Sequence, residues 1–135
     1  MAFVRAAEGA TQLETLTRGL LFVSEADHPF QVVRWPALPE LDEQRLLQAL
    51  GKPADSPVTR LTLEAFFARA VEDQSWHGPA ERVTVQRYRK LLDFLATSLE
   101  QPRAFRVGAI EVAAYALGKT SDGYWLGVAT TLIET

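Results

Sequence analysis

Hydrophobic residues recur three and four positions apart over much of the first hundred residues, which is the spacing of amphipathic helices. The strongest stripe runs from about Pro79 to Glu100 and consists of Val85, Tyr88, Leu92, Leu95 and Leu99. We expect Pro102 to end this helix. The same spacing predicts three shorter helices, at about 11–20 (beginning with the capping box TQLE), at 41–51 (LDEQRLLQALG) and at 64–70 (EAFFARA).

The remaining apolar runs are short, rich in β-branched and aromatic residues, and typical of strands. They cover 30–35, 58–63, 104–108, 111–120 and 124–135, the last two joined by the turn SDG with Gly123 in a left-handed position. Both sides of the last strand are apolar, with Leu126 and Val128 on one and Trp125 and Ala129 on the other. A sheet with one side in water would alternate apolar and polar residues. The pattern therefore predicts a single α/β domain over residues 1–135, a three-layer α/β/α sandwich whose mainly antiparallel sheet has helices on both faces.

The charge and the apolar content of the chain argue against nucleic acid and membranes as partners. The 135 residues include 17 acidic and 14 basic side chains, a net charge of −3, and no cysteine. Direct binding to nucleic acid is not expected, because such proteins usually have a surplus of basic residues. No apolar run is long enough for a signal peptide or a membrane span, so we expect a cytoplasmic protein that does not contact a membrane.

Motifs for catalysis or cofactor binding are absent from the sequence, and we expect neither an enzyme nor a cofactor. GKTSDG lacks the upstream glycine of a phosphate-binding loop and is interpreted as a hairpin turn. The histidines, His28 and His77, have no metal-ligand spacing. An enzymatic alternative would use His28 as a general base oriented by Asp27, without an accompanying nucleophile.

Three residues are instead candidates for contact with a partner. Glu25 lies in a tight loop before a strand, Trp76 lies in a polar loop flanked by glycine and proline, and Thr135 ends the last strand. Aromatic residues in such loops are over-represented among interface anchors. Each residue also has an ordinary structural explanation, as a solvated turn residue, a cover for the core or simply the end of the chain.

Several segments resemble the nuclease A inhibitor family, which inhibits sugar-nonspecific, metal-dependent ββα-type nucleases. They are GLLFVSEADHPFQVVRW, FFARAVEDQSW, YRKLLDFL and the closing GVATTLIET. The resemblance covers almost the whole chain and implies an α/β/α sandwich of the pathogenesis-related protein type, which is expected to be a monomer when free. It also implies that Glu25 engages catalytic side chains of the nuclease, that Trp76 lies beside it, and that Glu134 and Thr135 form the tip at which Thr135 is a ligand to the nuclease's magnesium.

Magnesium prefers hard oxygen ligands, so a terminal carboxylate beside a hydroxyl is suited to this role. The chain departs from the family pattern after the tryptophan, where HGPAER replaces carboxylates, and Arg34 is expected near the proposed surface. Reduced acidity would weaken steering towards a basic cleft. A non-inhibitory protein-interaction module on the same fold is therefore the alternative function.

Overall fold

The computed structural model describes residues 3–22, 28–36 and 40–133. Five strands form one antiparallel sheet in the order β3 (Gln31–Trp35), β7 (Trp125–Ile133), β6 (Glu111–Lys119), β5 (Glu100–Val107) and β4 (Val58–Leu61). Two further short strands, β1 (Leu21–Phe22) and β2 (His28–Pro29), pair with each other. The helices among the described residues are α1 (Ala6–Thr17), α2 (Glu43–Ala49), α3 (Leu63–Phe67) and α4 (Pro79–Ser98). The structure thus confirms a mixed α/β fold with an antiparallel sheet.

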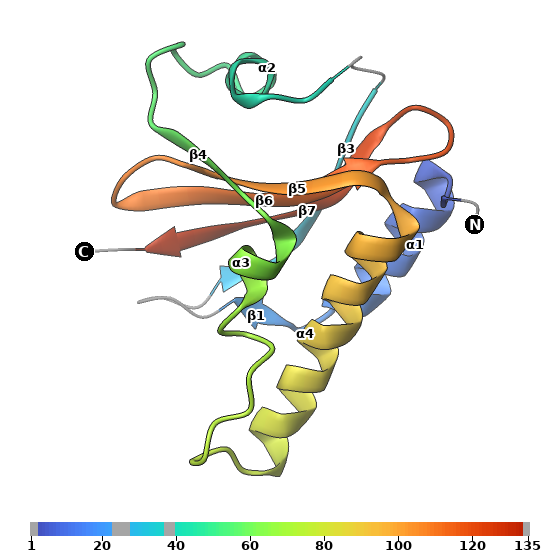
Figure 1. Cartoon of the computed structure of the whole chain (residues 1–135), viewed down its shortest axis with the longest axis vertical. Helices are drawn as coiled ribbons and strands as arrows, with labels where there is room; N and C mark the ends of the chain where they lie inside the picture. Colours follow the sequence, from blue (N-terminus) through green and yellow to red (C-terminus); the bar gives the residue numbers. More distant parts are fainter. Residues whose placement is uncertain (1–2, 23–27, 37–39, 134–135) are drawn as a thin grey trace.

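The sheet buries apolar side chains on both faces. One hydrophobic cluster lies between the sheet and the side that carries α1, α3 and α4, and it includes Leu13, Phe67 and Leu95 from these helices. The second cluster lies under α2, whose Leu46 and Leu47 pack with the sheet residues Phe105, Val107, Leu117 and Trp125. Figure 1 shows α2 on one side of the sheet and the other three helices on the opposite side. Because helices cover both faces of the sheet, both sides of the last strand, β7, carry apolar residues.

The helix predicted at about 11–20 is wrong at both ends. It runs from Ala6 to Thr17, and Thr11 lies inside it, where its hydroxyl donates to the carbonyl oxygen of Ala7. The first helical amide, that of Ala6, is instead satisfied by a carboxylate oxygen of Asp122, 2.9 Å away in the β6–β7 turn. A partner 116 residues away replaces the local capping box.

The other corrections concern the segment after the long helix and the one before β3. Helix α4 ends at Ser98, close to the predicted end at about Glu100, but β5 already begins at Glu100, so Pro102 is not what ends the helix. Pro102 lies within β5, at a register irregularity between Glu100 and Arg103. The pair β1–β2 was not predicted, because the residues before Phe30 have turn composition. Gly123 has the predicted left-handed conformation (φ 87°), and Gly51, which follows α2, also has a positive φ (68°).

Candidate protein-interaction site

Trp76 is the most exposed large hydrophobic residue of the described chain, with 73% of its surface accessible. It lies in the loop between α3 and α4, and this loop is held by hydrogen bonds at both ends. Arg89 of α4 donates to the carbonyl oxygen of Val71 (3.0 Å) and pairs with the carboxylate of Asp73 (3.4 Å). The prediction that Trp76 lies in a loop is confirmed, and the loop holds it largely in water.

The local structure around Trp76 also limits its motion. The Gln74 amide donates to Nδ1 of His77 (3.1 Å), the His77 amide donates back to Gln74, and the imidazole packs edge-on against the indole with ring centres 4.4 Å apart. Glu81 then accepts from the Gly78 amide at the start of α4 (2.7 Å). A side chain presented in this way loses little conformational freedom when a partner covers it.

Glu25, Glu134 and Thr135 lie outside the described residues, so their roles remain predictions. The residues on either side of the Glu25 segment are described, and Phe22 and His28 face each other as a pair in β1–β2. The hydroxyl of Thr130 in β7 donates to the carbonyl oxygen of Pro29 (2.9 Å), with a longer contact to that of His28 (3.4 Å). The strand that leads to Thr135 is therefore tied to the hairpin that brackets Glu25.

A cluster of aromatic rings connects this hairpin to the helices on either side of the Trp76 loop. Phe22 stacks on Phe66 of α3, with ring centres 5.2 Å apart and an interplanar angle of 7°, and it also contacts Phe30, Phe67 and Tyr88. The hydroxyl of Tyr88 in α4 donates to the carbonyl oxygen of Leu21. The hairpin, α3 and α4 thus share one core, which fixes their relative positions.

Arg34 does not lie where the sequence suggested. It pairs with Leu126, at the beginning of β7, and its guanidinium lies over the ring of Tyr124, 5.6 Å from the centroid. The proposed surface involves the opposite end of β7, after Ile133. Since antiparallel pairing places Arg34 near the start of that strand, its charge does not belong to the proposed contact surface.

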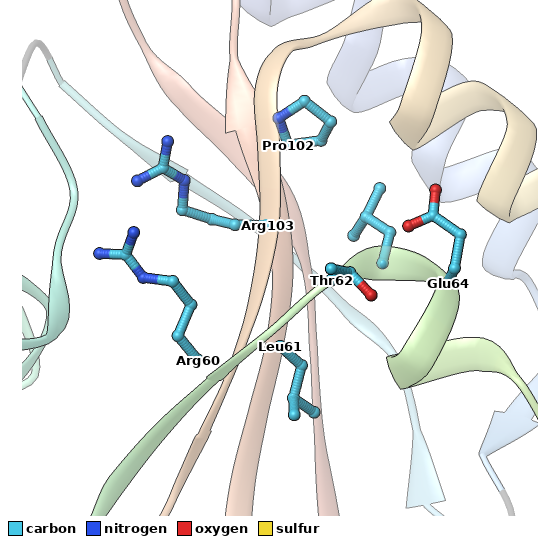
Figure 2. Close-up of a pocket in the computed structure, with 7 residues that line it drawn as sticks. Arg60, Leu61, Thr62, Glu64, Pro102 and Arg103 are labelled. Carbon is cyan, nitrogen blue, oxygen red and sulfur yellow. The ribbon is translucent and has the colours of Figure 1, made fainter.

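A pocket of about 430 Å³ lies between β4, α3 and β5. Figure 2 shows the two arginines of its lining, Arg60 and Arg103, pointing to the same side and away from Glu64. Arg60 pairs with Glu43 of α2 (2.7 Å), and Arg103 donates to the carbonyl oxygen of Leu41 (3.1 Å). Burial, and then the charge of Arg60, lowers the pKa of Arg103. Both cations attach the α2 region to the sheet, so this pocket is better explained as a structural junction than as a binding site.

The residues of the enzymatic alternative are only partly described. His28 is half-buried in β2, and Asp27 lies outside the described residues. No group of three or more histidine and carboxylate side chains in the described ranges could hold a metal ion. None of the described helices combines the length and the apolar character needed to cross a membrane.

A large aromatic side chain held in water on a fixed loop is typical of domains that bind other proteins. The family model described as Nuclease A inhibitor-like protein matches residues 7–135, which is nearly the whole chain. The chain therefore belongs to the nuclease A inhibitor-like family, as its sequence motifs predicted. No curated protein matches it. Family membership indicates a role in nuclease inhibition in general, with a nuclease as protein partner, and is consistent with a protein that is not an enzyme.

Proposed function

We propose that the protein inhibits a sugar-nonspecific, magnesium-dependent nuclease by occluding its active site. In this mechanism the loop containing Glu25 enters the cleft, Trp76 packs against the surface beside it, and the carboxyl-terminal Glu134 and Thr135 occupy the position of a scissile phosphate. Thr135 is then a ligand to the metal of the nuclease, while the inhibitor holds no metal of its own. The three-layer sandwich of the pathogenesis-related type, the cytoplasmic location and the monomeric free state belong to the same proposal.

The observation that most supports this mechanism is the hydrogen bond between Thr130 and Pro29, 2.9 Å long. It joins β7 to the hairpin on which Glu25 depends, and Thr130 is only 7% exposed. The described residues that precede Thr135 and those that flank Glu25 are thereby joined, and anchor points that are fixed relative to each other favour binding.

The test removes Thr135 or amidates the chain terminus, and the inhibition constant is measured against a purified magnesium-dependent nuclease from the same organism. Each change removes or neutralises oxygen ligands that magnesium favours, so inhibition should weaken strongly. A Glu25→Gln variant, which keeps the size of the side chain but removes its charge, should also inhibit less. Full inhibition by the shortened chain would exclude metal ligation, and an intact chain that inhibits no such nuclease would exclude the function.

A second candidate, a non-inhibitory interaction module, is favoured by the residues that follow Trp76. The carboxylate of Glu81 in this stretch accepts from the Gly78 amide at the start of α4 and is used for helix capping. It is therefore engaged within the protein and less available to a cationic cleft. Affinity capture with the intact chain distinguishes the candidates, because recovery of a direct partner without nuclease activity would support the module.

A further inference from the structure

The turn that carries Trp76 is closed twice by the residue that follows it, His77. The backbone amide of His77 donates to the carbonyl oxygen of Gln74 (3.0 Å), and Nδ1 of its imidazole accepts from the amide of Gln74 (3.1 Å). The same imidazole lies edge-on to the indole of Trp76, with ring centres 4.4 Å apart and an interplanar angle of 82°. Figure 1 shows this loop at the bottom of the view, at the start of α4. The place of the exposed tryptophan therefore depends on the side chain of His77 through both the turn and the ring contact.

The hydrogen bond to Nδ1 requires an uncharged imidazole. A neutral histidine has one ring nitrogen that donates and one that accepts, so a bond accepted at Nδ1 places the proton on Nε2. When the ring gains a second proton, both nitrogens become donors, and the N–H at Nδ1 then faces the donor N–H of Gln74. Two donors cannot form a hydrogen bond with each other. Protonation therefore removes one of the two closures of the turn and displaces the ring that lies beside Trp76.

The charged groups around this turn make their contacts elsewhere. Asp73 pairs with Arg89 of α4 (3.4 Å), Glu81 of α4 accepts from the backbone amide that precedes its own helix (2.7 Å), and Glu72 is exposed. In the part of the chain that the structure describes, none of them forms an ion pair with His77. Carboxyl groups ordinarily titrate near pH 4, whereas histidines do so between about pH 5 and 8. A change of pH in the neutral range therefore acts on this turn through the imidazole.

We propose that His77 is a positioning residue, which in its neutral form holds Trp76 for contact with the nuclease and on proton uptake weakens that contact. This inference rests on the proposed function and adds a pH-dependent control to a contact residue of the same site. Because the neutral form makes the hydrogen bond, binding is strongest above the range in which histidines titrate and weakens as pH falls through it. The loss of one hydrogen bond, and of the order that it gives the loop, corresponds to about fivefold weaker binding.

The test compares the wild type with His77→Asn at about pH 8 and about pH 5.5, on either side of the histidine range. The dissociation constant is measured by calorimetry with a purified magnesium-dependent nuclease from the same organism. Asparagine is the matched variant, because its Oδ1 is as many bonds from the backbone as Nδ1 of histidine and accepts from Gln74 without gaining a proton. We expect the two proteins to bind within about twofold of each other at the higher pH, and the wild type to bind about fivefold more weakly than the variant at the lower pH. Any pH response of the nuclease or of His28 is common to both proteins and cancels in their ratio.

A second readout needs no nuclease. In a pH titration of the free wild type followed by NMR, the Gln74 amide and the Trp76 indole N–H should shift together between about pH 5 and 8, and in His77→Asn both should stay in place. If the Gln74 amide does not shift in the wild type, or shifts equally in the variant, the inference fails. If the wild type binds the nuclease but the ratio of the two affinities is the same at both pH values, the inference fails while the function stands. A wild type that binds no such nuclease refutes the function, and the inference fails with it.

Discussion

Replacing Trp76 by alanine tests the proposed contact surface most directly. A tryptophan buries roughly 200 Å² when fully covered, and 73% of Trp76 is accessible in the free protein, so a partner could cover about 150 Å². At about 25 cal/mol per Å², this area corresponds to at most about 4 kcal/mol. Side chains that dominate interfaces typically contribute about 2–4 kcal/mol, so we expect the inhibition constant to rise by about 30- to 1000-fold.

The same substitution should hardly affect folding. Trp76 contacts His77, and its ring lies mostly in water, so the free energy of unfolding should change by less than about 0.5 kcal/mol. The assay pairs inhibition kinetics with urea unfolding, and Trp76→Phe is the conservative variant that should retain part of the affinity. Unchanged inhibition by Trp76→Ala would show that the nuclease does not cover this residue. A stability loss above about 1 kcal/mol would instead identify Trp76 as a cover for the core.

Three further predictions concern residues that stabilise the fold. Gly127→Ala should destabilise the protein by about 3 kcal/mol in urea unfolding, because the new Cβ would lie 2.0 Å from the carbonyl oxygen of Ala116; a normal midpoint would contradict this packing. Phe67→Ala should cost about 3–5 kcal/mol in the same assay, since Phe67 is fully buried, and a loss below 1 kcal/mol would be inconsistent with its position. The pKa of Asp122 is lowered, first by the Thr120 hydroxyl and then by the Ala6 amide. The ionised carboxylate therefore stabilises the fold fully above the unfolded-state pKa of about 4, and this stabilisation is lost as pH falls through the lower folded-state pKa. Asp122→Asn should therefore flatten the acid limb of a stability–pH curve, and an unchanged limb would exclude this role.

The elements that the sequence predicted well are those whose signal is local. The long helix was expected at 79–100 and is found at Pro79–Ser98, because its apolar stripe repeats over about four turns. The features that were missed depend on distant partners. Ala6 begins α1 with help from Asp122, and the two-residue strands of β1–β2 owe part of their position to Thr130. No local pattern encodes such contacts.

In the candidate site too, the features with a local sequence signal could be predicted and those that depend on distant contacts could not. Loop composition was sufficient to single out Trp76, since an aromatic residue between polar residues, glycine and proline has few reasons to be buried. The relative position of the Trp76 loop and the β1–β2 hairpin could not be predicted from the sequence. It depends on the packing of Phe22 against Phe66, which lie 44 positions apart in the chain.

The framework and the contact residues should respond differently to mutation. Phe22 is 8% exposed and contacts α3, α4 and the segment after β2, so truncating it would loosen the hairpin and lower stability and inhibition together. Trp76 is exposed, so truncating it should lower inhibition alone. The described strands on either side of the Glu25 segment are anchored in this aromatic core. We therefore expect affinity to depend on how firmly the core supports these strands as well as on the residues that touch the partner.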